Sequence, residues 1–314
     1  MDLKHAIAGY ALSLLLAAPA GAQTAAAAAI PDSVGVMLVA HGGGAAWNSR
    51  VDSLAVQVRS AGVVRGPLGV SFLMGPAAAE HRFQDVADSL AARGARVVVV
   101  VPLLVSSYSG HYEQIRYLTG LTDSLSDVMR MHLHMSGIQR PARSIAFRVT
   151  PALDSASELV DVLVDRALAV VPHPAGRALF FMAHGPNSAE AYAAWMAHLR
   201  PVVQQVKARA GFATASLELI RDDAPATVKA EARARSREII ALQHQVTGQD
   251  VAVVPILMSS SGINRTELPD DLAGLPVLYD PAPLLPHPAM VRWVERMTRS
   301  AVSGPAVAAA SQRH

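Results

Sequence analysis

Hydrophobic residues occur along the chain in short uninterrupted runs, separated by segments with helical spacing. In the first half such runs cover residues 36–40 and 97–104, and a second strand is predicted near 68–73. Between them, the apolar spacing predicts helices over 48–61 and 76–93, the second of which begins with a proline, as helices often do. Runs of this kind are typical of parallel strands that are buried on both faces. The pattern therefore predicts an α/β fold, with a parallel sheet flanked by helices.

The same order of strands and helices then occurs a second time. A fourth strand at 144–149 and a helix at 155–169 complete the first half. The sequence thus predicts two tandem similar lobes, residues 31–170 and 177–302, with a cleft between them. In the second half we predict strands over 178–183, 214–220, 250–257 and 276–279 and helices over 188–210, 225–246 and 288–302.

A shared motif supports the reading of the two halves as a repeat. An apolar strand runs directly into Ala-His-Gly at His41 and again at His184, and in each half a later apolar run ends in proline and leads to a Ser-Gly pair. The halves differ after that pair, where the first has His111 and the second has Ile-Asn, ending at Asn264. Ligands of parallel sheets bind beyond the carboxyl ends of the strands, so His41 and His111 are predicted to share one rim.

The two ends of the chain are predicted to lie outside the folded lobes. Residues 1–22 have the features of an export signal: Lys4, an apolar stretch from Ala8 to Ala18, and an Ala-Gly-Ala cleavage site. We therefore expect a periplasmic or secreted protein. No later stretch approaches the length of a transmembrane helix, so no membrane span is expected in the mature form. The tail, 303–314, is predicted to be disordered.

Composition narrows the possible partners. The chain has no cysteine, so a metal must be held by histidine, carboxylate, methionine or water. Its net charge is only +2, its basic residues are scattered and 5% of its residues are aromatic, which argues against nucleic-acid binding. The glycines 42–44 lack the Lys-Ser/Thr of a phosphate-binding loop, so we expect no nucleotide and interpret them as allowing close approach to a flat ligand.

The sequence resembles the class II tetrapyrrole chelatases, the cobalt and sirohydrochlorin chelatases of cobalamin, sirohaem and nickel-tetrapyrrole synthesis. The resemblance lies in the strand-His-Gly motif at His41, in Val-Pro-Leu-Leu-Val-Ser-Ser-Tyr-Ser-Gly-His at 101–111, and in the related segment 253–269. The resemblance covers nearly all of the mature chain and is to the form of the family in which two similar domains follow one another. It implies that His41 and His111 are the catalytic pair, binding the divalent metal and taking the pyrrole protons as the metal enters the macrocycle.

The resemblance also implies a reaction and further contacts. We expect an exported, ATP-independent chelatase that inserts cobalt, nickel or iron, as a substrate, into a sirohydrochlorin-like tetrapyrrole. The alternative is a carrier protein that uses the same cleft to hold a metal or a metallated tetrapyrrole, and export favours that alternative. The residues expected to contact the tetrapyrrole are Gly42, Ser109, Gly110, His184 and Asn264.

In the second half the family's second histidine is replaced by Asn264, a poor ligand for a borderline transition metal. His184 is therefore either substrate-facing or a vestige. Glu113 and Glu267 follow the two Ser-Gly pairs and either orient a histidine or lie on a solvated helix surface. Glu218 lies in the second strand, where many family members carry an acidic residue, and the first-half counterpart around 72–74 is apolar.

An insertion in the first half, residues 121–141, has no counterpart in the second. It contains His132 and His134 among three methionines. If the segment is extended, both histidines lie on one face and could bind a soft metal; if it is helical, they diverge. The insertion is then an amphipathic flap over the cleft. Because two lobes are already present in one chain, a monomer is sufficient.

Overall fold

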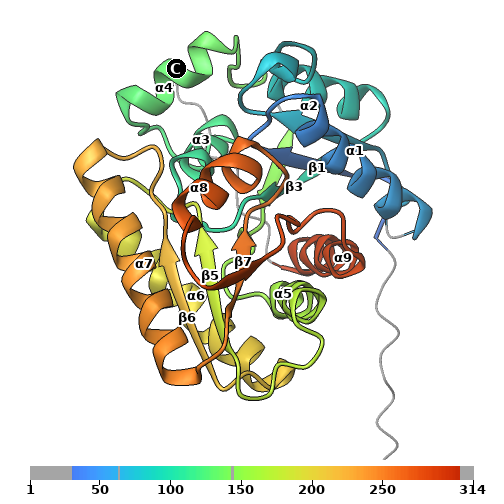
Figure 1. The fold of residues 1–314 in the computed structure, drawn as a ribbon. Coiled ribbons are helices and arrows are strands. Elements are labelled where there is room, and N and C mark those ends of the chain that lie inside the picture. The colour runs from blue at the N-terminus through green and yellow to red at the C-terminus, as the bar shows by residue number, and fades with distance from the viewer. Residues whose placement is uncertain (1–29, 63, 143–144, 305–314) are drawn as a thin grey trace, which may run out of the picture.

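The fold consists of two four-stranded parallel sheets flanked by helices, as seen in a computed structural model that describes residues 30–62, 64–142 and 145–304 (Figure 1). The predicted export signal and the tail beyond residue 304 lie outside these ranges. The first sheet contains β1 (Val34–Ala40), β2 (Leu68–Phe72), β3 (Val97–Leu103) and β4 (Ala146–Val149). The second contains β5 (Ala178–Ala183), β6 (Thr214–Leu219), β7 (Val251–Ile256) and β8 (Val277–Tyr279).

Both sheets have the same topology, which confirms the internal repeat at the level of structure. The strand orders are β2-β1-β3-β4 and β6-β5-β7-β8. The register matches too, because Ala40 pairs with Leu103 in the first sheet and Ala183 pairs with Ile256 in the second. In each sheet the order reverses between the two central strands, and such a switch point is where ligands bind in open α/β sheets.

The helices form layers on both faces of each sheet. On the first sheet α2 (Phe83–Ala92) packs against β1 and β2, and α1 (Ala45–Ser60) also contacts β2. On the second sheet α7 (Ala226–Thr247) packs against β5, β6 and β7, and α6 (Ala189–Ala210) packs against β6. Shorter elements are α3 (Gly110–Leu118), α4 (Asp127–Met135), α8 (Leu268–Leu272), the 3₁₀ turn η1 (Pro76–Glu80) and the π-helical turn η2 (Ile263–Glu267).

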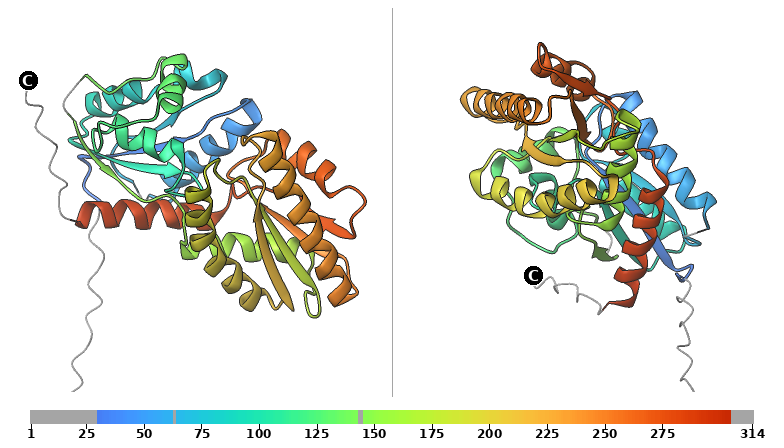
Figure 2. Two further views of the ribbon diagram at one scale, coloured as in Figure 1. Left: turned by 90° about the vertical axis from the view of Figure 1, so that its left-hand side faces the viewer. Right: turned by 60° about the horizontal axis from the view of Figure 1, so that its bottom comes forward.

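Each half of the chain donates its last helix to the other lobe. Helix α5 (Ser157–Val170) follows the first sheet in sequence but packs against β7 and α6 of the second. Helix α9 (Pro288–Ser303) ends the second half but packs against α1 and β3 of the first, and Figure 2 shows it lying along the first lobe. The predicted boundaries 31–170 and 177–302 therefore divide the sequence, whereas the lobes in space exchange these helices.

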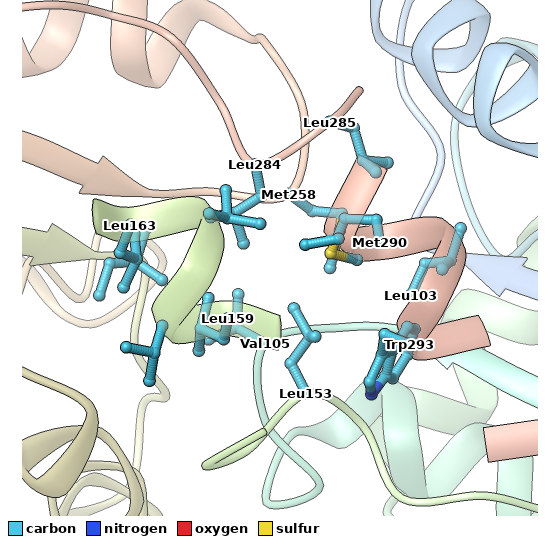
Figure 3. Packing of buried hydrophobic residues seen from close by; sticks show 14 of the residues in the cluster. Leu103, Val105, Leu153, Leu159, Leu163, Met258, Leu284, Leu285, Met290 and Trp293 are labelled. Carbon is cyan, nitrogen blue, oxygen red and sulfur yellow. The ribbon is translucent and has the colours of Figure 1, made fainter. Parts of the chain in front are cut away.

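The exchanged helices join the two lobes in one hydrophobic core. The core cluster contains residues from β1 and β3, from β5 and β7, and from α1, α5, α6 and α9. Figure 3 shows its centre, where Leu159 of α5 and Trp293 of α9 pack with residues that follow the ends of β3 and β7. Trp293 is fully buried. Smaller clusters lie on the outer face of each sheet, under α2, α3 and α4 in one lobe and near α7 and α8 in the other.

Most predicted elements are present, with differences in three segments. The helix predicted over 76–93 is divided into η1 and α2, because His81 (φ −128°, ψ 35°) and the extended Arg82 interrupt the helical backbone. The segment 110–141 contains α3, which was not predicted, and α4, which is the helical alternative for the insertion. Residues 263–272 form η2 and α8, which were not predicted either. None of the helices in the described ranges has the length and hydrophobicity that a bilayer crossing requires.

Candidate metal centre

His41 follows β1 directly, and the glycine after it determines how its ring is held. Gly42 adopts φ +90°, and a Cβ there would lie 2.2 Å from the carbonyl oxygen of Met74. Only glycine fits this position without strain. His41 Nδ1 lies 2.6 Å from the carbonyl oxygen of Gly42, so Nδ1 must carry the hydrogen and donate it. In the neutral ring Nε2 is then unprotonated and free to bind a metal.

His111 lies in the first turn of α3, beyond the end of β3. Ser109 caps this helix, its hydroxyl accepting a hydrogen bond from the Tyr112 amide. His111 Nδ1 lies 2.8 Å from Gln114 Oε1, and the Gln114 amide in turn donates to the carbonyl oxygen of Met129 at 2.8 Å. That second bond fixes the orientation of the amide, so Oε1 accepts from His111 Nδ1. His111 Nε2 is therefore also left free.

The two histidines form a close pair. Their ring centroids lie 4.5 Å apart, with the planes nearly perpendicular at 87°. Burial, together with the nearby ring of His41, lowers the pKa of His111 to about 4. Burial also lowers the pKa of His41. Both imidazoles are therefore neutral at physiological pH, which is the form that binds metal.

A third histidine reaches the pair from the insertion. Residues 127–135 form the helix α4, so His132 and His134 diverge and the extended His-x-His arrangement does not occur. The His132 ring stacks on His111 at a centroid distance of 6.5 Å, while His134 is exposed. The buried His132 Nδ1 forms no hydrogen bond with any residue that the structure describes. The helix approaches closely because Gly110 leaves room, as a Cβ there would lie 2.7 Å from Met129 Sδ.

The second lobe faces this pair with His184 and two carboxylates. His184 and Asp223 both act electrostatically on His41, the first lowering its pKa and the second raising it. His184 repeats the geometry of His41: it follows β5, and its Nδ1 lies 2.9 Å from the carbonyl oxygen of Gly185, which adopts φ +81°. His184 Nε2 lies 3.3 Å from Asp222 Oδ1 and 3.4 Å from Asp223 Oδ2.

Asn264 does not lie in a position to bind a ligand. It is completely buried, its Oδ1 accepts from the Ser261 amide at 2.7 Å, and its Nδ2 donates to the carbonyl oxygen of Pro281 at 2.5 Å. Both ends of the side-chain amide are thus used to hold the loop around η2. The side-chain amide of Asn264 therefore has no group left for the predicted tetrapyrrole contact. Ser109 caps α3, and its tetrapyrrole contact stays a prediction.

The three glutamates noted in the sequence lie away from the histidine pair. Glu218 is buried, where it accepts from the Tyr192 hydroxyl at 2.9 Å and pairs with Arg235 at 3.2 Å. Its counterpart by strand register is Ser71, so the expected match to residues 72–74 was wrong. Glu113 is exposed and Glu267 pairs with Lys229 at 3.1 Å, so neither orients a histidine.

Four residues of the site were not predicted in their present roles: Gln114, His132, Asp222 and Asp223. A glutamine three residues after a histidine at a helix start is a usable signal for Gln114, since side chains at i and i+3 lie on one helix face. The adjacent aspartates follow a predicted strand at its carboxyl end, where ligands bind. His132 was noted, but its contact with His111 depends on the path of a 21-residue insertion.

Comparisons with known proteins agree with the fold. The sequence profile of the CbiX family matches residues 35–170. SirB from Bacillus subtilis, solved with Fe3+, is 12% identical, with a TM-score of 0.58 over 86% of this chain and 96% of its own. DR2241 from Deinococcus radiodurans, a multi-domain protein with structural similarity to chelatases and two additional novel domains, is 17% identical, with a TM-score of 0.50 over 90% of this chain and 56% of its own.

A third structure is that of CbiX, the terminal enzyme for biosynthesis of sirohaem in denitrifying bacteria. It is 17% identical, with a TM-score of 0.48 over 86% of this chain and all of its own. No curated protein sequence matches the chain. At these identities the first two structural likenesses establish the fold alone, and the profile match covers residues 35–170. The resemblance to the chelatases is thereby confirmed: residues 35–170 match the CbiX family model, and the chain has the two-lobed fold of chelatase-like proteins.

Proposed function

We propose that the chain is an ATP-independent chelatase that inserts a divalent metal into a sirohydrochlorin-like tetrapyrrole. The observation that carries this proposal is the pairing of His41 and His111 at 4.5 Å, with both Nδ1 atoms held by fixed acceptors. The two Nε2 atoms are then free to bind one metal ion between them. Imidazole suits cobalt, nickel and iron(II), because these ions prefer ligands of intermediate softness.

The histidine pair also accounts for the protons of the reaction. Insertion of a divalent metal releases two pyrrole N–H protons from the macrocycle, while the metal leaves the two imidazoles. Each freed Nε2 can accept one proton. Because the pKa of His111 is about 4, the imidazolium passes its proton to water at neutral pH and returns to the neutral form that binds the next ion. No nucleotide is required if the tetrapyrrole binds the metal more tightly than the protein does.

Export through residues 1–22 is part of this proposal. Its support is the basic, apolar and small-residue order of that segment. Fusing residues 1–22 to a periplasmic reporter tests it: we expect the reporter to be exported, and retention in the cytoplasm would refute export.

A carrier function is the second candidate, and His132 is the observation that favours it. A third imidazole stacked on His111, with a buried and unpartnered Nδ1, would hold a metal more tightly than two histidines alone. A carrier retains its metal, whereas a chelatase must release it to the macrocycle.

The decisive experiment follows cobalt(II), nickel(II) and iron(II) insertion into sirohydrochlorin by absorbance. Insertion above the spontaneous rate that is lost in both His41→Ala and His111→Ala would support the chelatase. His134→Ala, an exposed histidine on the same helix as His132, is the matched control and should retain full activity. Metal or tetrapyrrole binding without turnover would instead identify a carrier.

A further inference from the structure

We propose that His184, Asp222 and Asp223 form a second divalent-cation site, on the rim of the second lobe that faces His41. One Nε2 and two carboxylate oxygens, one from each residue, lie within 4.8 Å of one another. Four-coordinate ligand atoms about 2.1 Å from an ion are about 3.4 Å apart, a geometric consequence of tetrahedral bond lengths. The separations of His184 Nε2 from the two carboxylates, 3.3 and 3.4 Å, match that spacing.

The hydrogen bonding of His184 makes its Nε2 available. Nδ1 donates its hydrogen to the carbonyl oxygen of Gly185, so the neutral ring presents an Nε2 lone pair to two carboxylates. The lone pair and the two negatively charged carboxylates repel one another unless a positive charge lies between the three atoms. Either a second proton on the imidazole or a bound cation removes the repulsion, and these two states can be told apart by experiment.

Asp222 provides a second and independent indication of a ligand. Its side chain is only 10% exposed, and Oδ1 is fully buried without a hydrogen bond from any described residue. In the part of the chain that the structure describes, neither Asp222 nor Asp223 pairs with lysine or arginine, since the nearby Lys229 binds Glu267. A buried carboxylate oxygen without a donor is costly unless it binds a cation.

The chain directs Asp222 toward His184 by an unusual turn. Arg221 adopts φ +51°, and its guanidinium donates to the carbonyl oxygens of Pro186 and Asn187 in the loop that follows His184. The Arg221 amide donates to the carbonyl oxygen of His184 at 2.7 Å. The matching bond in the first lobe runs from the Met74 amide to His41, so Gly75 and Pro76 occupy the places of Asp222 and Asp223. The carboxylates belong to the second lobe alone.

The donor set defines the class of ion. One imidazole and two carboxylates suit divalent cobalt, nickel, iron, manganese or zinc, and they do not suit the soft copper(I) ion. Because His184 and Asp223 act electrostatically on His41, ions at the two sites repel one another. The second ion therefore binds more weakly than the first. If the second site supplies metal to His41 and His111, that role depends on the proposed chelatase function. The existence of the second site does not depend on it.

Cobalt(II) binding to the purified full chain tests the proposal, measured by titration calorimetry and by the visible absorbance of four-coordinate cobalt. We expect two ions per chain. The double variant His41→Ala with His111→Ala should keep one ion, and Asp223→Asn should raise the Kd of that ion by at least about tenfold. Asp223 is exposed, so this substitution leaves folding intact. Asp250→Asn, an exposed aspartate just before β7, is the control and should change nothing.

The outcomes separate this proposal from the first. If the His41/His111 double variant binds no cobalt, the second site is refuted, whatever the chelatase assay gives. If that variant binds one ion and wild type binds no more, the second site stands and the metal-binding role of the histidine pair fails. If the His184 ring titrates as an imidazolium whose pKa is unchanged by cobalt, the protonated alternative holds and the proposal is overturned.

Discussion

Gln114 holds the ring of His111 through a single hydrogen bond of 2.8 Å, and the other end of the same amide holds the backbone of α4 at Met129. The residue that orients a metal ligand is thus also the residue that docks the helix carrying His132. Loss of this glutamine should therefore affect metal binding as well as stability.

The first prediction concerns Gln114→Leu. Without the acceptor on Nδ1 the His111 ring is no longer fixed, and cobalt affinity should fall about 10–100-fold, the usual cost of losing the partner that orients a ligand. Gln84→Leu is the matched control, because Gln84 is also buried and both its hydrogen bonds go to the backbone of the insertion, at Gly137 (2.9 Å) and Gln139 (3.2 Å). Equal losses of cobalt affinity in the two variants would contradict the prediction.

The second prediction concerns pH. Protons compete with a metal for a histidine only at pH values near or below the pKa of that histidine, which is about 4 for His111. Proton competition at His111 should therefore be negligible from neutral pH down to about 5 and should weaken cobalt binding below that pH. An NMR titration of the imidazole protons checks this, with the exposed His134 as reference. Titration of His111 near the usual 6.5 would refute it.

The same pKa has a consequence for stability with a defined sign. The folded pKa of His111, about 4, lies below the usual value of 6.5, so between these two pH values the unfolded chain binds more protons. The free energy of unfolding therefore rises with pH from about 4 to 6.5. His111→Phe, which cannot be protonated, should flatten this part of the stability profile in urea titrations. A profile identical to wild type would argue against it.

The third prediction concerns the loop after His41. Gly42→Ala should lower the free energy of unfolding by about 1–3 kcal/mol, because its φ is +90° and the new Cβ would meet the Met74 carbonyl. Gly44→Ala, two residues along, has φ −69° and open space around it, so its effect should stay within about 0.5 kcal/mol. Thermal unfolding of both variants measures the difference, and equal effects would count against the assigned role of Gly42.

The fourth prediction concerns the shared core. Trp293→Ala should destabilise the protein by about 3–5 kcal/mol, the usual range for removing a buried tryptophan. Because α9 packs on one sheet and α5 on the other, both lobes should unfold in a single transition. Far-UV circular dichroism and tryptophan fluorescence should then give coincident curves. Val246→Ala, at an 81% exposed position, is the control, and two separate transitions would disprove the coupling.

Sequence patterns predicted the sheets well because buried parallel strands have a simple signature. The strand Val97–Leu103 is apolar at every position, and the strand-end positions of His41 and His184 follow from the ends of β1 and β5. The pairing of His41 with His111 required the strand order as well, since it depends on β1 and β3 being neighbours. The family resemblance supplied the pairing itself, whereas the strand order was not predicted.

The rest of the site depends on contacts that no local pattern records. The insertion is helical at 127–135, and its Met-rich composition did not reveal that Leu133 would be buried while His134 stayed in solvent. The turn at Arg221 that brings Asp222 to His184 requires a backbone conformation that arginine rarely adopts. The exchange of α5 and α9 is equally invisible, because both helices have ordinary amphipathic spacing.

The exchange of helices has a consequence for how the chain can be divided. A cut in the connection at 171–176 would leave each half carrying the helix that completes the other, so the two fragments should bind each other rather than fold alone. A single repeat could meet the same need by pairing with its own copy. The tandem chain is thus equivalent to a symmetric dimer joined end to end, and the link between its halves leaves each free to develop its own ligands.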